Sequence, residues 1–166
     1  MADGLIFKHV RLYYIGSNMY YIILAVALVA ADQILKYLAI RFVNMGGQIP
    51  IIEGFFNITC IKNEGIAMGM FSGMQTAVIA LTSVVMLMIA LYILKEHKKR
   101  NRLELTLLVM ILAGGIGNLI DRIRLNYVVD YIDFQIWNYI FNFADICVVL
   151  GCLGMFFCVF FDSKGK

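Results

Sequence analysis

Three aspartates, Asp130, Asp133 and Asp145, lie near one another in an otherwise apolar part of the chain. Two carboxyl groups that come within a few ångströms of each other cannot both ionise cheaply, so one keeps its proton. Such a pair can act as general base and general acid toward a water molecule. The acids therefore indicate aspartic-peptidase chemistry, which requires no metal.

Asn142 stands three residues before Asp145, at the start of an apolar run. This spacing is also typical of a capping box, in which the two side chains satisfy backbone groups at a helix N-terminus. Capping alone requires only one or two polar residues and leaves the acids of the preceding loop unexplained. We therefore predict that Asp145 both opens a helix and meets a second acid.

A second polar group, Asn118, Asp121 and Arg122, has the i, i+3 and i+4 spacing of one helical face. Taken alone, it fits a helix C-terminus with an Asp–Arg pair. The glycines just before it, at 114, 115 and 117, favour close helix packing.

Asp32 and Lys36 interrupt the first apolar stretch at i and i+4, so they can form an ion pair that faces other helices. A secretory signal peptide is an alternative, because basic residues precede a stretch that ends in Ala30 and Ala31.

Asn63 precedes the second stretch, where its amide can hold a peptide backbone or cap a helix. Gly65, Gly69 and Gly73 recur every four residues, which indicates helix packing.

The composition of the chain is typical of a membrane protein. Apolar residues make up 62% of the 166-residue chain and charged residues 15%, and mean hydropathy is +0.84. Four apolar runs are long enough to span a bilayer, at about 19–40, 74–94, 103–120 and 146–161. The predicted fold is a membrane all-α bundle of four transmembrane helices with a small β element.

The charge pattern predicts the topology of these spans. Residues 95–102 carry five basic side chains, so this loop and both termini are predicted to be cytoplasmic. Segments 41–65 and 122–141 then face outward, as short strands or a flat platform with an interfacial loop. Trp137, Tyr139 and Phe141 are expected at headgroup depth. His9 and His97 lie in basic segments on the other side, which disfavours serine–histidine catalysis.

The predicted organisation is one domain at 19–161, between an N-terminal tail at 1–18 and a cytoplasmic tail at 162–166. Gly16, Ser17 and Asn18 precede Met19, a sequence compatible with an added leader and a natural start at Met19. The four cysteines form no C-x-x-C pair, so neither disulfides nor a metal site are inferred. The net charge of +3 is too small to suggest a nucleic-acid partner.

Five short segments together resemble the lipoprotein signal peptidases, also called signal peptidase II, a family of bacterial four-span aspartic peptidases. In the order of that family they are 32–36 (DQILK), 63–67 (NEGIA), 114–122 (GGIGNLIDR), 128–131 (VVDY) and 141–145 (FNFAD). The resemblance implies that Asp130 and Asp145 are the catalytic pair, with Asp133 outside it. It places the family's supporting residues at Asp32, Lys36, Asn63, Asn118, Asp121, Arg122 and Asn142.

The resemblance also implies the reaction and the partners. The substrate would be a prolipoprotein whose cysteine carries diacylglycerol, cut immediately before that cysteine. Membrane lipid and cyclic peptide inhibitors such as globomycin would be further partners, with no cofactor, no metal and no nucleic acid. The protein would lie in the bacterial cytoplasmic (inner) membrane with its active site at the outer face.

Two other functions compete with the peptidase. A small ion- or proton-coupled transporter could use Asp32, Lys36 and the outer acids as a relay. A relay requires titratable groups spread through the membrane, whereas most acids here crowd toward one side. A non-enzymatic assembly protein could recruit helices through its glycines, and it would then keep its function in an Asp130→Asn variant.

Overall fold

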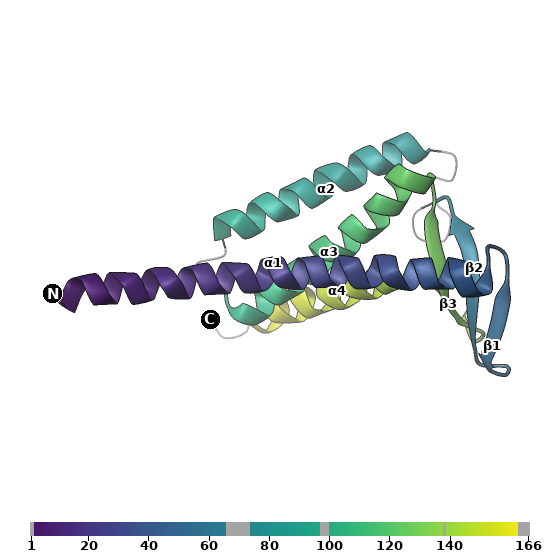
Figure 1. The fold of residues 1–166 in the computed structure, drawn as a ribbon, viewed down its shortest axis with the longest axis horizontal. Helices are drawn as coiled ribbons and strands as arrows, with labels where there is room; N and C mark the ends of the chain where they lie inside the picture. Colours follow the sequence, from purple (N-terminus) through teal and green to yellow (C-terminus); the bar gives the residue numbers. More distant parts are fainter. Residues whose placement is uncertain (1, 66–73, 97–99, 138, 163–166) are drawn as a thin grey trace.

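The computed structural model describes residues 2–65, 74–96, 100–137 and 139–162 (Figure 1). Four long helices and a four-stranded sheet make up the fold. In chain order the elements are α1 (Ala2–Val43), β1 (Gln48–Ile52), β2 (Phe56–Asn63), α2 (Gln75–Glu96), α3 (Arg102–Leu125), β3 (Val128–Phe134), β4 (Ile140–Phe141) and α4 (Phe143–Asp162). The predicted fold class is thus confirmed.

Each helix contains a segment long and apolar enough to cross a membrane, namely Met19–Val43, Gln75–Glu96, Arg102–Leu125 and Phe143–Phe161. The chain is therefore a multi-pass membrane protein.

Helix α4 begins at Phe143, directly after Asn142, as the predicted capping box requires. Helix α3 continues past 120 and ends at its C-cap Asn126, whose left-handed backbone (φ 64°) lets its N–H bond the Arg122 carbonyl at 3.0 Å. Arg122 therefore lies in α3, as its i, i+4 spacing from Asn118 indicated, and the outer segment begins after Asn126 rather than at 122.

Helix α1 runs without a break from Ala2, so the predicted N-terminal tail continues the first span as helix. Within the span, Asp32 and Lys36 are buried, at 1% and 2% exposed, and both contact other helices. This packing favours an integral helix over a secretory signal peptide. Gly69, Gly73 and His97 lie outside the described residues.

The outer segments form the predicted short strands, which join into one antiparallel sheet in the order β1-β2-β3-β4. Strand β2 pairs with β3 so that Asn63 faces Val128 and Ile61 faces Asp130. The sheet packs on the end of α1 through a buried cluster of Ala39, Val43, Cys60, Val129 and Tyr131. The sheet is thus fixed to the bundle and brings the 63 and 130 regions together.

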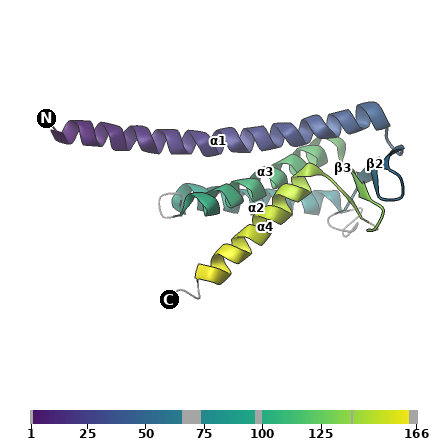
Figure 2. The same ribbon diagram turned by 90° about the horizontal axis from the view of Figure 1, so that it is seen from below.

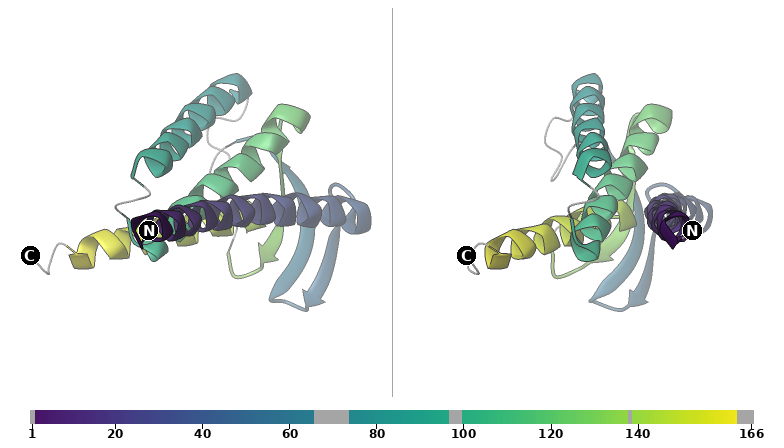
Figure 3. Two further views of the ribbon diagram at one scale, coloured as in Figure 1. Left: turned by 60° about the vertical axis from the view of Figure 1, so that its left-hand side comes forward. Right: turned by 90° about the vertical axis from the view of Figure 1, so that its left-hand side faces the viewer.

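Helix α3 lies between the other three helices, as two views along the bundle show (Figure 3). Helix α2 packs against α3. Helix α4 diverges from α1 toward its C-terminal end (Figure 2). The N-terminal end of α1 and the C-terminal end of α4 both lie away from the sheet (Figure 1). This arrangement agrees with four spans, while the side of the membrane on which the ends lie stays a prediction.

Glycines in α3 permit the close helix contacts that the sequence indicated. A Cβ added to Gly114 would overlap the Ala144 carbonyl oxygen of α4. A Cβ added to Gly117 would lie 2.6 Å from Oδ2 of Asp32 in α1. Larger side chains at these positions would push α1 and α4 away from α3.

A buried ammonium group ties these elements together. Lys36 Nζ lies 2.9 Å from Asp32 Oδ2, 3.0 Å from Asp121 Oδ2 and 2.9 Å from the Asn118 side-chain oxygen. Asp32 Oδ1 also accepts from the Ala144 N–H at 3.0 Å, and Asp121 Oδ2 accepts from the Val129 N–H at 3.2 Å. The predicted i, i+4 pair is thus confirmed, as part of a network that joins α1, α3, α4 and β3.

The Gly117→Ala variant is expected to be less stable than the parent protein, because the new methyl group displaces the Asp32 carboxylate from this network. We expect a loss of about 1–3 kcal/mol in the free energy of unfolding, the range for overpacking a tight contact. Thermal unfolding of the purified protein in detergent measures it.

Gly154→Ala is the matched control, since the added Cβ there meets the flexible Cδ atoms of Leu107. It should cost clearly less stability than Gly117→Ala. Equal losses in the two variants would contradict a special role for the Asp32 contact.

Candidate active site

Asp130, in the middle of β3, is completely buried and held by two side-chain amides. Its Oδ2 accepts from Asn63 Nδ2 at 2.8 Å, and its Oδ1 accepts from Asn142 Nδ2 at 2.6 Å. Asn63 comes from the end of β2 and Asn142 from the residue just before α4. Three separate segments of the chain therefore fix the position of this carboxyl group.

Asp145 lies in the first turn of α4 and is half-buried. Its Oδ1 accepts from Asn118 Nδ2 at 2.7 Å, and its Oδ2 accepts from the Asn142 N–H at 3.2 Å. Asn142 Oδ1 in turn accepts from the Asp145 N–H at 3.0 Å, so the predicted capping box is confirmed. The amide donors and the helix N-terminus both stabilise a negative charge at this carboxylate.

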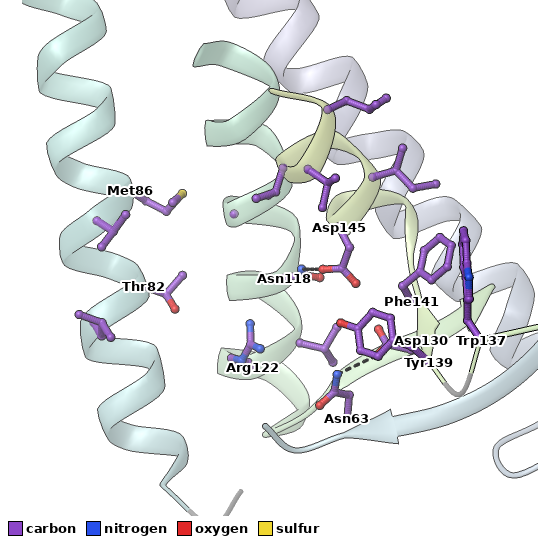
Figure 4. A pocket seen from close by; sticks show the side chains of 18 residues that line it. Asn63, Thr82, Met86, Asn118, Arg122, Asp130, Trp137, Tyr139, Phe141 and Asp145 are labelled. Carbon is purple, nitrogen blue, oxygen red and sulfur yellow. Dashed lines mark hydrogen bonds between the residues drawn. The ribbon is translucent and has the colours of Figure 1, made fainter. Parts of the chain in front are cut away.

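Asn142 connects the two acids, since its side-chain amide bonds Asp130 while its backbone N–H and side-chain oxygen bond Asp145. The two carboxyl groups, which come from separate elements, both line one cavity (Figure 4). Asp145 points into this cavity from α4, and the Asn118 side chain reaches Asp145 from α3 (Figure 4).

Burial raises the pKa of the Asp130 carboxyl from its usual 3.8 to about 7, and the neighbouring charge of Asp145 adds to the rise. The hydrogen bonds from Asn63 and Asn142 and the charge of Lys36 oppose the rise only in part. Asp130 therefore keeps its proton at a pH at which an ordinary aspartate has lost it. The site can hold one proton beside a carboxylate.

Arg122 and Asn63 fix the segment that leads from β2 toward α2. Arg122 Nη2 donates to the Gly65 carbonyl at 2.8 Å, and the Gly65 N–H donates to Asn63 Oδ1 at 3.0 Å. The Asn63 oxygen is thereby occupied, so its NH₂ group faces Asp130. Asn63 thus contacts both backbone, through its side-chain oxygen, and an acid, through its NH₂ group.

Asp133 is also buried, but its carboxylate belongs to the sheet. Oδ2 accepts from Thr59 Oγ1 at 2.7 Å and from Gln135 Nε2 at 3.0 Å, and Asp133 is absent from the cavity wall. The structure thus separates Asp133 from Asp130 and Asp145. Among the described residues, no group of three His, Cys, Asp or Glu side chains is placed to hold a metal ion.

Gln33 is a supporting residue that the sequence analysis missed. Its Nε2 lies 3.1 Å from Asp121 Oδ1 and 3.2 Å from the Gly117 carbonyl oxygen, so it links α1 to α3 beside the Lys36 network. Its position next to Asp32, within the same polar interruption of an apolar run, is a signal that could have identified it.

An apolar cavity of about 660 Å³ lies beside the two acids, between α2 on one side and α3 and α4 on the other (Figure 4). Its polar lining comes from the acids, Asn63, Asn118, Arg122 and Thr82. The aromatic residues that the sequence singled out, Trp137, Tyr139 and Phe141, also line it. Their headgroup depth stays a prediction. The two acids therefore face a space suited to an apolar ligand.

Comparison with protein families matches residues 24–161 to the model described as signal peptidase (SPase) II. The chain belongs to the signal peptidase II family. A peptidase is a hydrolase, so the protein is a membrane-embedded hydrolytic enzyme of this family, and this identification supports the peptidase and not the transporter.

Relatives along the whole domain are called lipoprotein signal peptidases. One from Fusobacterium nucleatum is 41% identical over 138 residues, which are 82% of this chain and 84% of the relative. One from Clostridioides difficile is 37% identical over 154 residues, which are 89% of this chain and 100% of the relative.

A solved structure described as a bacterial membrane enzyme has the same architecture. It superposes on this signal peptidase II homologue with a TM-score of 0.81 at 31% sequence identity. The match covers 89% of this chain and 91% of the other. The bundle and sheet are thus a fold shared with an enzyme of known structure.

The protonated carboxyl of Asp130 is expected to titrate with a midpoint at about pH 7. Infrared difference spectroscopy of the purified protein measures this as a C=O band that is absent in Asp130→Asn. Asn63→Ala should move the midpoint to higher pH, because Asn63 donates to the carboxylate and so lowers its pKa.

Thr59→Val is the control for this titration, because it removes a donor from Asp133 and none from Asp130. Its midpoint should match that of the parent protein. A band that titrates near pH 4 in the parent would show that Asp130 is an ordinary exposed acid.

Proposed function

We propose that this signal peptidase II homologue is an aspartic endopeptidase that removes the signal peptide from diacylglyceryl-modified prolipoproteins. It cuts immediately before the lipidated cysteine and uses no metal. The observation that carries the proposal is that Asn142 holds both Asp130 and Asp145 at the wall of one apolar cavity. The names of the relatives support the choice of substrate.

The pKa of Asp130, raised to about 7, and the surroundings of Asp145 assign the two roles in our mechanism. Asp145, half-buried and facing the cavity, takes a proton from water, and the resulting hydroxide attacks the scissile carbonyl carbon. Asp130 gives its proton to the carbonyl oxygen as the tetrahedral intermediate forms. The pair then carries one proton again, now on Asp145.

In the second half of the reaction, Asp145 returns its proton to the leaving amide nitrogen and the C–N bond breaks. The hydroxyl proton of the intermediate goes back to Asp130 as the new carboxyl group forms. Over the whole cycle the enzyme neither gains nor loses a proton, so both acids return to their starting states. Asn63, Asn118 and Asn142 keep the carboxyl groups in place throughout.

The cavity supports a lipid-borne substrate. The wall includes apolar side chains of α2 and α4, so a signal peptide and acyl chains can enter sideways from the bilayer without passing through water. Both acids lie at the end of the bundle nearest the sheet, and the peptide bond would be presented there. A cyclic lipopeptide-type inhibitor such as globomycin would occupy the same space.

The proposal includes the orientation of the protein in the membrane. Helix α2 ends and helix α3 begins at the end of the bundle away from the sheet (Figure 1), and the basic segment 95–102 connects them in the sequence. By the positive-inside rule this end is cytoplasmic, together with both termini, and the active site faces outward across the bacterial inner membrane.

Cleavage of a purified diacylglyceryl-modified prolipoprotein tests the catalytic pair. Asp130→Asn and Asp145→Asn are each expected to lower kcat by about 10²–10⁴-fold, since each removes a proton-transfer group. The assay uses protein in detergent or lipid, with and without a chelator, which should leave the parent activity unchanged.

Asp133→Asn is the matched control, because Asp133 is buried in the same strand as Asp130, and it should cut at close to the parent rate. If all three variants cleave normally, the acids are structural and the aspartic mechanism is wrong. If Asp133→Asn alone is inactive, the assignment of the pair is wrong.

The rate of cleavage should follow a bell-shaped pH profile, because one acid must be ionised and the other protonated. The alkaline limb should fall through about pH 7, where Asp130 loses its proton. Asn63→Ala should move that limb upward, and Thr59→Val should leave it in place. A rate that stays constant through this range would rule out Asp130 as the proton donor.

A further inference from the structure

Arg124, in the last turn of α3, is an exposed cation on a membrane-spanning helix. Its Nη1 donates to the Gln33 side-chain oxygen of α1 at 3.4 Å, and among the described residues it forms no ion pair with an acid. A charged side chain on the surface of a membrane helix is costly unless an opposite charge pairs with it. The anion that pairs with Arg124 therefore has to come from outside the described chain.

Arg124 lies on the side of α3 that faces away from the catalytic cavity. It follows Arg122, which lines the cavity, by two residues, and two residues turn an α-helix by about 200°. Lys62 has the same relation to Asn63, because neighbouring residues of a strand point to opposite faces of the sheet. The two cations thus belong to a surface that the acids do not share.

The three exposed cations Arg124, Lys62 and Arg41 come from the ends of α3, β2 and α1, which lie together at the sheet end of the bundle (Figure 1). Lys62 Nζ lies 5.0 Å from the centre of the Tyr127 ring, and Tyr127 packs against the buried cluster at the end of α1. Arg41 is in the last turn of α1, and helical side chains lean back toward the N-terminus. Even with Glu64, an exposed acid two residues after Lys62, this junction is positively charged.

The surface becomes apolar on the side of the cations that lies away from the sheet. Val26 precedes Gln33 by seven residues, so it lies on the same face of α1 about 10.5 Å deeper in the bundle. It is 63% exposed, and Ile120, one turn before Arg124 on α3, is half-buried. Cations at one level with an apolar helix surface below them match the headgroup and the acyl chains of a phospholipid, whereas a free anion would need only the cations.

We propose that Arg124, Lys62 and Arg41 bind the headgroup phosphate of an anionic phospholipid beside α1 and α3, in the leaflet at the sheet end of the bundle. Arg124 contacts the phosphate oxygens through its planar guanidinium fork, and an acyl chain follows α1 past Val26. The site lies outside the catalytic cavity, and the proposal does not depend on the proposed peptidase function.

Gln33 connects this site to the centre of the bundle. Its side-chain oxygen accepts from Arg124, and its NH₂ group donates to Asp121 Oδ1 at 3.1 Å. The other oxygen of Asp121 lies 3.0 Å from Lys36 Nζ. A lipid that holds Arg124 in place thereby also strengthens the contact between α1 and α3. Because such a ligand binds the folded protein only, it raises the free energy of unfolding.

The experiment follows thermal unfolding of the purified protein in an uncharged detergent as lipid is added. Dioleoyl phosphatidylglycerol is the anionic probe. Dioleoyl phosphatidylcholine has the same chains and a phosphate but no net charge, and sn-glycerol 3-phosphate has a phosphate but no chains. Phosphatidylglycerol should raise the unfolding midpoint most, and glycerol phosphate should leave it unchanged.

Arg124→Gln should weaken the apparent affinity for phosphatidylglycerol by about tenfold, as expected when a charged hydrogen-bonding group is lost. Arg124→Lys keeps the charge without the planar fork, so its affinity should lie between those of the parent and Arg124→Gln. Lys62→Gln should also weaken binding, and it tests the site through a residue outside the helices.

Lys95→Gln is the matched control, since Lys95 is an exposed cation in the last turn of α2, at the opposite end of the bundle. It removes the same charge and should leave the affinity for phosphatidylglycerol unchanged. If it weakens binding as much as Arg124→Gln does, the protein responds to total charge and the site is wrong.

The comparison arms decide the chemistry of the ligand. Equal stabilisation by phosphatidylcholine would show that the net charge of the lipid is not recognised, and the proposal would be wrong. An equal shift with glycerol phosphate would show a site for a free anion rather than a lipid. The assay contains no peptide substrate, so its result is separate from the success or failure of the proposed function.

Discussion

The ammonium group of Lys36 is the interaction on which the rest of the site depends. A lysine buried inside a membrane bundle is tolerable only when paired, and here two carboxylates and one amide oxygen surround it. Because the Asn118 oxygen accepts from Lys36, the NH₂ group of Asn118 must face the other way, toward Asp145. The pairing that joins the helices therefore also orients a donor to one of the acids.

The orientation of the other two side-chain amides of the site is set in the same way, by the bond that each oxygen accepts. The Asn63 oxygen is taken by the Gly65 N–H and the Asn142 oxygen by the Asp145 N–H, which leaves each NH₂ group to face Asp130. Each of these three asparagines thus bonds the surrounding structure through its side-chain oxygen and an acid through its NH₂ group. A glutamine would place its amide one methylene further out, and an aspartate would replace a donor with an acceptor.

Much of this could be predicted from the sequence because it depends on short-range spacing. The apolar runs predict the spans, the i, i+4 spacing predicts the Asp32–Lys36 pair, and the three-residue spacing predicts the Asn142–Asp145 capping box. The Asn63–Asp130 bond could not be predicted, since it joins residues 67 apart through the register of β2 on β3. The raised pKa of Asp130 depends on its burial, which only the complete fold determines. The outer segment after α3 begins later than predicted because the helix continues to its C-cap Asn126.

The capping box at Asn142 links the order in which the chain is synthesised to the assembly of the site. The hydrogen bonds that start α4 are the same ones that position Asp145, and the Asn142 side chain also reaches Asp130. The last span in chain order therefore completes the proposed catalytic pair. Since chains fold from the N-terminus as they are made, a nascent chain that holds only the first three spans contains Asp130 but not Asp145, and the proposed site forms only when the final helix is present.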